Sequence, residues 1–436
     1  MRASIAATIE IPCHPAGKLR RILFLTDAPR TFEQQFPMAR ALEATGQWET
    51  WFMPLAALEQ DDTTKVRLWP LSAAAGRPGA HEPSDGIAAP RSKARRWLGS
   101  LLQRRAMTVP RELILAVLHG RAWRRQRALA RACLAALGPS CLITAQERDD
   151  TALPIVAAAR DLSIPTILVS VAGLYMPDGG AFMRRNSNVM KLDPDPNGTD
   201  NDWGQILLNR LVGRLQPGHV FASRWGRMLH RPAHWYLAAW FAALGLRSGW
   251  FQGTRFIDAI VVSGNDELRV CRAAGVSEHR IAAIGSPAFQ IHYERMRERA
   301  RIRAQLGVAP DQILLISSPP PLWEHRMIEQ DDHFAFIDGL LTVLSKSRCT
   351  VIVSLHPKLS RELYEPRIRA AGATIAALPL TEILAAADLF VAGAYSSTIR
   401  WAMAIGIPSA NLDLWELNEG TYRDDVDYPK IGRAHV

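Results

Sequence analysis

The chain has 436 residues, of which 48% are hydrophobic, so it can bury a large core, and its length favours two domains over one. Its formal net charge of +10 indicates an anionic partner such as a nucleotide, a phospholipid surface or nucleic acid. Its 5 cysteines lie far apart and include no CxxC pair. This spacing argues against a disulfide framework and a cysteine metal site, and it fits a reduced cytoplasmic compartment.

The N-terminus lacks an apolar core followed by a small-residue cleavage site, so it does not read as a secretory signal. The longest apolar run, residues 235–246, is too short to cross the roughly 30 Å of a bilayer core as a helix. We therefore expect a cytoplasmic protein that is either soluble or peripheral on the inner face of the plasma membrane. The C-terminal IGRAHV matches what a common sequencing-library adapter encodes, so residues 431–436 are interpreted as an artefact after a truncated gene.

In chain order, residues 21–29 (RILFLTDAP) predict a strand that runs into a loop, and the helically spaced run after them ends at Gly46. A second strand is predicted at WETWFMPL. The segment 73–90, rich in Gly, Pro and Ala, predicts a surface loop. Residues 91–137 predict strongly basic helices, whose charge belongs either to solvated faces or to a surface that docks on anionic lipid.

The next stretch predicts a β-α-β unit over residues 141–173 and then a polar insertion from 176 to 205. Within the insertion, Asp193 and Asp195 imitate a DxD metal motif or the start of a calcium loop. Gly204, however, stands where the closing Glu of a calcium loop belongs. An acidic, turn-rich loop is the favoured interpretation.

Strand and helix patterns follow over residues 256–289, and a charged helix suited to a connector follows them. The alternation then restarts and continues almost to the C-terminus. Unbroken apolar strands that alternate with helices predict parallel sheets covered on both faces. The predicted fold class is therefore α/β, with two doubly wound, Rossmann-like domains and a cleft between them. The predicted organisation is an N-terminal domain at residues 19–290, a connector at 291–308 and a C-terminal domain at 309–430.

Polar residues follow predicted C-terminal strands at their carboxyl ends, where ligands bind in open parallel sheets. Ser317 and Ser318 end the first of these strands, and Ser396, Ser397 and Thr398 follow another. The last three residues open a helix, whose unpaired first amides favour a phosphate. The alternative is that one serine only caps the helix.

The strand VIVSL stops at His356 and Pro357. Pro357 disfavours a helical backbone at His356, so the imidazole is held in one direction, and His356 and Lys358 can then contact a phosphate. Donor-rich loops at the ends of adjacent strands therefore predict an anion site in the C-terminal domain.

A strand that ends in His-Pro, followed further along by YSST and an A-x-x-x-G-I-P helix, resembles the nucleotide-binding half of the GT-B superfamily. The pattern is similar to CDP-glycerol glycerophosphotransferase-like enzymes and to bacterial sialyl- and Kdo-transferases with His-Pro and Ser-Ser motifs. The resemblance implies a GT-B-like fold. It implies that His356, Pro357, Ser396 and Ser397 bind the phosphates and ribose of a nucleotide donor. Ser317, Ser318, Lys358 and Thr398 are predicted to bind the donor as well, because they lie in the same donor-rich loops.

Many UDP-dependent enzymes of this fold place a ribose-binding Glu shortly after the serine motif, where this chain has Arg400 and Trp401. This difference slightly favours a CMP- or CDP-linked donor over a UDP-linked one, and both stay open.

Two further segments, ERDDTALPIVAAARDLSIPTILVSVAGLY and GVSEHRIAAIGSPAF, are similar to parts of UDP-N-acetylglucosamine 2-epimerases, which share the fold. That family carries a carboxylate just before its Ala-Gly-Leu and an Arg just after it, whereas Val171 and Tyr175 flank the motif here. SSPPPLW replaces the family's His-Arg loop. Because no group is evident for removing a proton from a sugar carbon, epimerase chemistry is disfavoured.

Glu147, Asp149 and Asp150 follow a strand of the N-terminal domain and are expected to face the cleft. Transfer to a hydroxyl needs a base within hydrogen-bond reach, so this cluster is predicted to be catalytic, although one Asp can instead cap the next helix. Asp27, after the first strand, is a weaker candidate. His230 and His234 lack a third ligand, so no metal site is expected there.

The sequence thus predicts a metal-independent GT-B-type glycosyltransferase without a cofactor. It would transfer a sugar or polyol phosphate from a nucleotide-activated donor to a cell-envelope polysaccharide or glycolipid. The expected partners are this donor, the acceptor and a membrane surface, with no nucleic acid. Two alternatives stay open: a UDP-N-acetylglucosamine 2-epimerase-like enzyme, and a catalytically inactive GT-B scaffold.

Overall fold

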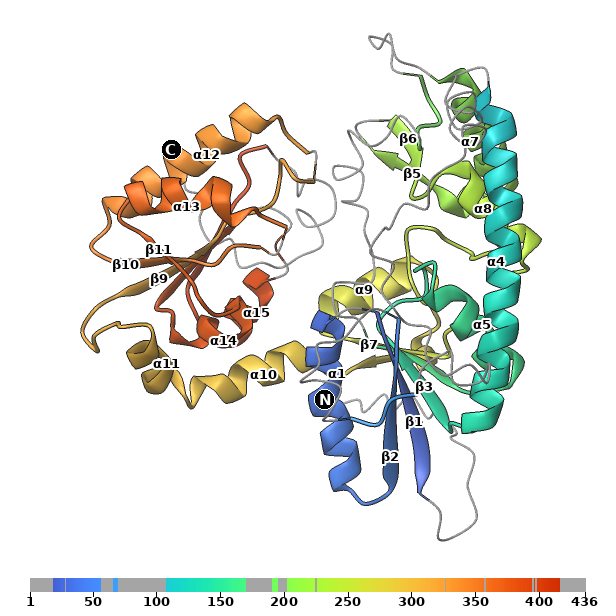
Figure 1. The fold of residues 1–436 in the computed structure, drawn as a ribbon, viewed down its shortest axis with the longest axis horizontal. Coiled ribbons are helices and arrows are strands. Elements are labelled where there is room, and N and C mark those ends of the chain that lie inside the picture. Colours follow the sequence, from blue (N-terminus) through green and yellow to red (C-terminus); the bar gives the residue numbers. More distant parts are fainter. Residues whose placement is uncertain are drawn as a thin grey trace, which may run out of the picture. The chain divides into compact units, whose positions relative to one another are not determined.

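The computed structural model describes residues 19–27, 29–55, 66–69, 107–169, 190–194, 202–223, 226–325, 327–356, 358–393, 396 and 398–415. The chain divides into two compact units, one formed by Met1–Met176 with Ser187–Gly285 and the other by Pro177–Asn186 with Ser286–Val436 (Figure 1). Several predictions concern positions outside the described residues, namely the loop at 73–90, Asp195, Pro357, Ser397 and residues 431–436.

A six-stranded parallel sheet forms the centre of the first unit, in the order β2-β1-β3-β4-β7-β8. Its central strands are continuous apolar runs because both faces of the sheet are covered. The order reverses between β1 and β3, which makes this pair the switch point of the sheet. The strands are β1 (Arg20–Thr26), β2 (Trp48–Pro54), β3 (Cys141–Thr144), β4 (Thr166–Val169), β7 (Ala259–Val262) and β8 (Ile281–Ala283).

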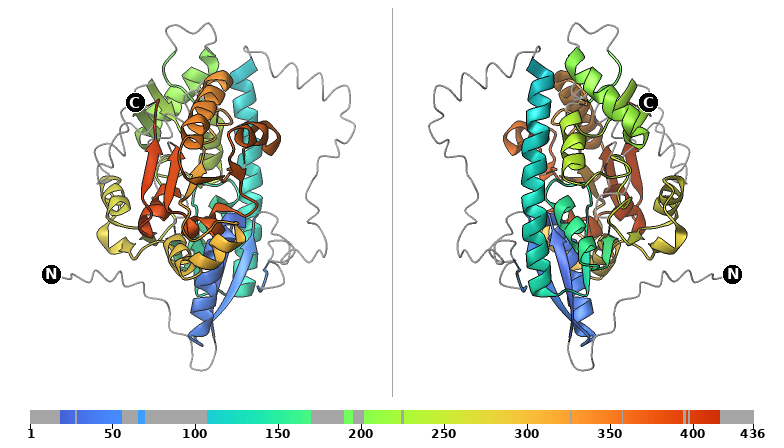
Figure 2. Two further views of the ribbon diagram at one scale, coloured as in Figure 1. Left: turned by 90° about the vertical axis from the view of Figure 1, so that its left-hand side faces the viewer. Right: turned by 90° about the vertical axis from the view of Figure 1, so that its right-hand side faces the viewer.

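Helices of the first unit cover this sheet, and a helical layer extends beyond it. The long helix α4 packs closely on α8, because a Cβ added at Gly120 would lie 3.1 Å from Cβ of Phe241 (Figure 2). The helices are α1 (Pro29–Ala44), α4 (Thr108–Leu137), α5 (Ala152–Asp161), α7 (Trp203–Leu215), α8 (Ala233–Phe241) and α9 (Asn265–Ala273). The short strands β5 (Val220–Ser223) and β6 (Gly226–Leu229) pair antiparallel between α7 and α8.

The second unit contains a five-stranded parallel sheet in the order β11-β10-β9-β12-β13. The strands are β9 (Leu314–Ser318), β10 (Thr350–Val353), β11 (Thr374–Ile375), β12 (Leu389–Gly393) and β13 (Ser409–Leu412). The helices are α10 (Pro287–Met296), α11 (Arg299–Gln305), α12 (Gln330–Ser345), α13 (Arg361–Ala370), α14 (Leu380–Ile383) and α15 (Thr398–Ala404). Apolar side chains on both faces of the sheet form two clusters of buried residues.

These two sheets confirm the predicted α/β class with two doubly wound sheets. The predicted insertion ends earlier than expected, because α7 already begins at Trp203, where the Asp202 carboxylate accepts a hydrogen bond from the Gln205 amide. The sequence pattern assigned no elements to residues 206–255. The structure places α7, the β5–β6 pair and α8 there.

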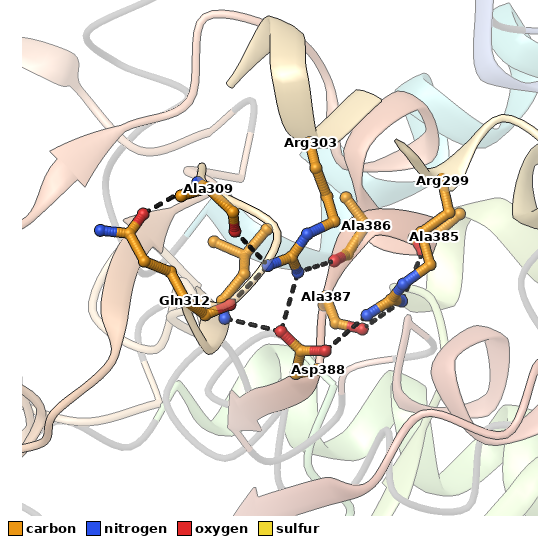
Figure 3. A network of polar contacts seen from close by, with 9 residues as sticks. Arg299, Arg303, Ala309, Gln312, Ala385, Ala386, Ala387 and Asp388 are labelled. Carbon is orange, nitrogen blue, oxygen red and sulfur yellow. Dashed lines mark hydrogen bonds and ion pairs between the residues drawn. The ribbon is translucent and has the colours of Figure 1, made fainter. Parts of the chain in front are cut away.

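Asp388, immediately before β12, joins the starts of two strands to helix α11 in the second unit (Figure 3). Its Oδ2 accepts hydrogen bonds from the amide of Leu314 at 2.8 Å and from Nη1 of Arg303 at 2.8 Å, while Oδ1 pairs with Arg299 Nη2 at 2.5 Å. Desolvation raises the pKa of Asp388. The Leu314 amide and the two guanidinium groups outweigh this effect and hold the pKa below its usual value. One carboxylate thus aligns the starts of β9 and β12 and ties α11 to both.

The segment predicted as a connector carries apolar residues that are buried in the second unit. Ile302 is 1% exposed and packs in the same cluster as Leu314 and Phe390. Arg299 and Arg303 also donate to carbonyl groups at residues 385–387. Residues 299–308 therefore belong structurally to the second unit.

Substituting Asp388→Asn should lower the free energy of unfolding by about 1–3 kcal/mol, because two guanidinium groups lose their shared anion. Urea unfolding followed by circular dichroism measures the change. Asp338→Asn is the matched control, since Asp338 pairs with Arg367 on an exposed surface and should change the stability by less than about 1 kcal/mol. Equal effects of the two substitutions would contradict the role given to Asp388.

Candidate functional site

The candidate site of the second unit lies at the carboxyl ends of β9, β10 and β12. Ser317 in β9 is aligned with Val353 of β10 on one side and Val391 of β12 on the other. The prediction that the His-Pro and Ser-Ser loops follow adjacent strands was wrong, because β9 inserts between them, and the two outer strands are therefore about 10 Å apart. The topological switch point falls between β9 and β12.

The loop after β9 crosses the end of β12. A Cβ at Gly393 would lie only 2.2 Å from Cγ of Pro320, so this close approach requires glycine. Beyond the prolines, the chain makes a helical turn in which the amide of His325 donates to the carbonyl of Pro321 at 2.9 Å. The turn is anchored by buried Leu322 and brings His325 to the carboxyl edge of the sheet.

His356 begins a turn in which its carbonyl accepts a hydrogen bond from the Leu359 amide at 2.8 Å. Its Nδ1 accepts a hydrogen bond from the backbone amide of Lys358 at 3.1 Å. An Nδ1 that accepts carries no proton, so the neutral ring is protonated at Nε2. The backbone amide of Lys358 therefore fixes the tautomer of His356, in which Nε2–H is the donor of the ring.

Three cationic or potentially cationic side chains meet at these loops: His325, His356 and Lys358. The Lys358 ammonium donates to Nε2 of His325 at 3.0 Å, and the rings of His325 and His356 lie 6.1 Å apart, edge to face. Burial, followed by the charges of Lys358 and His356, lowers the pKa of His325 to about 4. His325 is therefore neutral near pH 7 and becomes a stronger anion partner if an anion nearby offsets the surrounding positive charge.

A buried hydrogen-bond chain holds the loop that carries His325. The Tyr364 hydroxyl of α13 donates to Glu324 Oε1 at 2.6 Å and is paired with Nε2 of His333 on α12 at 2.6 Å. Because the hydroxyl gives its proton to the carboxylate, it accepts from the imidazole. Burial lowers the pKa of His333 to about 4, and burial together with the Glu324 carboxylate raises the pKa of Tyr364.

The serine residues of the site differ in their surroundings. Ser317 is buried, and its hydroxyl has no hydrogen-bond partner among the described residues. Ser318 is 9% exposed, next to the switch point. Ser396 Oγ contacts Oγ1 of Thr398 at 2.5 Å, at the start of α15. Ser317 and Ser318 end β9, and Ser396 and Thr398 follow β12, so these hydroxyl groups lie at the same edge of the sheet as the cationic cluster, and the hydroxyl of Ser317 retains an unused donor.

In the first unit, the predicted catalytic Glu147 is fully buried. Its two carboxylate oxygens accept hydrogen bonds from four consecutive backbone amides, those of residues 253–256, at 2.6–3.2 Å. All of its acceptor positions are therefore in use. The arrangement gives Glu147 the task of holding the loop before β7.

The other carboxylates of this unit also have partners. Asp149 Oδ1 accepts from the amide of Thr151 at 2.9 Å, at the start of α5, and Asp150 Oδ1 accepts from Trp235 Nε1 at 2.6 Å. Asp27 lies at the switch point of the first sheet, where its carboxylate contacts Thr31 and Gln146. The structure thus brings Asp27 to the edge where Glu147 and its neighbours follow β3.

The side chains in the motifs that resembled metal sites form contacts with other residues of the protein. Nδ1 of His234 contacts Glu112 Oε2 at 2.8 Å, His230 packs on Trp250, and Asp193 pairs with Arg227 at 2.7 Å. In the part of the chain that the structure describes, no group of three or more His, Cys, Asp or Glu side chains could hold a metal ion. None of the described helices is both long and apolar enough to cross a membrane.

Sequence reasoning missed His325, Glu324 and Tyr364. The sequence did contain a signal for Glu324 and His325, because SSPPPLWEH follows a buried strand. Its three prolines restrict the backbone of the loop, so the titratable residues that follow are held in defined positions. Tyr364 gave no signal of its own, since an aromatic residue at helical spacing reads as core.

No family model matches the chain, and no curated protein matches it in sequence. Solved structures with a similar course of the chain include UDP-GlcNAc 2-epimerase from Neisseria meningitidis bound to UDP-GlcNAc. It has a TM-score of 0.46 and 9% identity, with 87% of this chain and 78% of that chain covered.

MurG from Acinetobacter baumannii has a TM-score of 0.38 and 10% identity, with 92% of this chain and 80% of that chain covered. The wall teichoic acid polymerase TagF with CDPG has a TM-score of 0.39 and 11% identity, with 90% and 69% covered. At these values the likeness carries no argument about activity.

Replacing Tyr364 by Phe should lower the free energy of unfolding by about 1–3 kcal/mol, because Glu324 and His333 both lose their partner in a buried setting. Urea unfolding provides the measurement. Tyr293→Phe is the control, since Tyr293 is 59% exposed and its hydroxyl is available to water. An unchanged stability of the Tyr364→Phe protein would show that the hydrogen bonds from Glu324 through Tyr364 to His333 do not hold the loop that carries His325.

Proposed function

We propose that this protein is a GT-B-type transferase that moves a sugar or polyol phosphate from a nucleotide-activated donor to a hydroxyl group of a cell-envelope polysaccharide or glycolipid. The observation that carries the proposal is the meeting of His325, His356 and Lys358 beside the switch point of the second sheet. Open parallel sheets bind ligands at such points, and a cationic cluster selects an anionic ligand.

In this proposal the second unit holds the phosphates of the donor. Nε2–H of His356 and the Lys358 ammonium supply donors from the loop after β10, and the hydroxyl of Ser317 supplies another from β9. Ser396 and Thr398 donate from the far side of the switch point. Charge that develops on the departing phosphate is thereby stabilised without a rearrangement of the site.

The reaction would be a direct displacement. The acceptor oxygen forms a bond to the anomeric carbon or phosphorus of the donor as the bond to the nucleotide breaks, and the acceptor proton passes to a carboxylate. Asp149 and Asp150 are the proposed bases, since each has a second carboxylate oxygen, Oδ2, besides the Oδ1 that accepts the hydrogen bond described above. Glu147, with its four amide partners, positions the neighbouring loop.

Exposed apolar side chains support a peripheral position on the cytoplasmic face of the plasma membrane, where a lipid-linked acceptor would be found. On α7, Trp203, Leu207, Leu211 and Leu215 recur on one face and are 56%, 59%, 47% and 51% exposed. Arg214 lies on the same face, and this combination of apolar and cationic residues is typical of a helix that lies in a bilayer interface.

Calorimetric titration with UDP and CDP tests the donor site. The unmodified chain should bind at least one of them, and His356→Asn should weaken the binding at least about tenfold, because it removes Nε2–H and keeps a polar side chain. His279→Asn, which changes an exposed His of the first unit, is the control. A folded chain with no affinity for either nucleotide would favour an inactive scaffold. Turnover of a donor without acceptor would favour an epimerase.

Donor binding should strengthen as the pH falls from about 7 toward 5. The free protein keeps His325 neutral down to a pKa of about 4, and a bound diphosphate raises that pKa, so binding takes up a proton. The gain is at most about tenfold per pH unit for one proton. UDP-N-acetylglucosamine is a suitable probe because its diester phosphates do not titrate in this range. An affinity that stays constant with pH would contradict the placement of the phosphates beside His325.

A further inference from the structure

The long helix α4 carries positive charge that the proposed donor site does not use. Its inner face packs on α8, so its opposite face points to solvent, as the right-hand view of Figure 2 shows. Residues at positions i, i+4, i+7 and i+11 lie on one side of a helix, and on this outer face they are Ile114, Leu118, Arg121 and Arg125. The outer face of α4 therefore begins apolar and becomes cationic.

The first half of the outer face exposes a group of large apolar side chains. The exposed fractions are 44%, 48%, 40% and 54% for Leu113, Ile114, Val117 and Leu118. Single exposed apolar residues are common on soluble proteins, whereas a contiguous group indicates a surface that contacts another molecule. A solvated helix face would explain the arginines, but it gives no reason for these four side chains.

The exposed apolar stripe of α7 adjoins α4 at the N-terminal ends of both helices. A Cβ added at Gly204 would lie 3.2 Å from Cβ of Thr108 and 3.3 Å from Cγ2 of Val109. The Thr108 hydroxyl also donates to Oδ2 of Asp202 at 2.6 Å. The stripe of α7 therefore begins, at Trp203, next to the first turn of α4. Two neighbouring helices thus expose large apolar side chains in the same unit.

The exposed charges of these helices have one sign. Glu112 is the one acidic residue of α4, and it is buried and contacts His234, while α7 and α8 contain no acidic residue. Arg121 and Arg125 are exposed and form no hydrogen bond or ion pair with other described residues. Arg214 adds an exposed positive charge on α7. The surface therefore combines apolar side chains with positive charge that no carboxylate of these three helices offsets.

This combination distinguishes between the possible partners. A second copy of the chain would bring arginines against arginines, because the two copies present the same charges. A nucleic acid binds arginine side chains through its phosphates, but it has no apolar layer to receive the leucines. An anionic bilayer supplies phosphate groups for the arginines and an apolar layer beneath them for the leucines and for Trp203.

We infer that the outer face of α4 docks, together with α7, on a bilayer that contains anionic phospholipids. Ile114 and Leu118 would enter the boundary between headgroups and acyl chains, and Arg121 and Arg125 would contact the lipid phosphates. The inference deepens the proposed function and rests on it for the interfacial position of α7. It adds a second helix to that contact and names the class of lipid.

Flotation of the full chain with lipid vesicles, without nucleotide, tests the inference. The chain should bind vesicles of phosphatidylcholine and phosphatidylglycerol, mixed three to one, at least about tenfold more tightly than vesicles of phosphatidylcholine alone. Replacing Arg121 and Arg125 together by Gln should weaken binding to the anionic vesicles at least about tenfold, since each arginine near such a surface contributes roughly fivefold. The matched control replaces Arg297 and Arg348, two exposed arginines of the second unit, by Gln.

A second pair of variants tests the apolar part of the surface. Ile114→Gln combined with Leu118→Gln should weaken binding to the anionic vesicles at least about tenfold, because both side chains lose their place in the apolar layer. Ile313→Gln combined with Val343→Gln is the control, since these side chains are 51% and 67% exposed in the second unit. Circular dichroism should show the same folded state for all variants, because every replaced side chain is exposed.

Three results would overturn the inference: no binding of the unmodified chain to the anionic vesicles, equal binding to both kinds of vesicle, or full binding by either double variant of α4. A dimer that is lost in these variants, measured by sedimentation velocity without vesicles, would assign the surface to a second copy of the chain instead. Calorimetric titration of the same proteins with UDP and CDP reports on the donor site alone, so failure of the proposed function is recognised separately.

Discussion

The carboxylate of Asp388 is the constraint on which the second unit depends. It holds the first amide of β9, the start of β12 and two arginines of α11 at one point. The strands β9 and β12 run parallel and in register as far as Ser318 and Ala392, so the loops after them leave the sheet side by side. The candidate site at the carboxyl edge is thus set by an ion-pair network at the opposite edge.

The chemistry of that site follows from how its positive charge is controlled. The amide of Lys358 selects the tautomer of His356, and burial together with the charge of Lys358 lowers the pKa of His325, so this ring is neutral near pH 7. The hydrogen bonds that connect Glu324, Tyr364 and His333 restrain the loop that carries His325. In the proposed function these donors are positioned before the ligand binds, which would reduce the entropy lost on binding.

Much of the architecture could be predicted from the sequence, because buried parallel strands such as β9 and β12 are unbroken apolar runs. The site was predicted less completely. His356 was found because it ends such a strand, whereas His325 depends on a turn after three prolines that has no periodicity. The role of Glu147 could not be predicted, since the amides that it binds lie more than 100 residues away in the chain. The strand β9 was predicted, but its position between the two donor-rich loops was not, because strand order depends on long-range pairing.

The most direct test of the central claim is a nucleotide titration followed by nuclear magnetic resonance of the histidine side chains. The account predicts that CDP or UDP shifts the ring signals of His325 and His356 together, while exposed His279 of the first unit stays unchanged. Binding of a nucleotide that leaves the His325 and His356 signals in place would contradict the account, because the phosphates would then lie elsewhere.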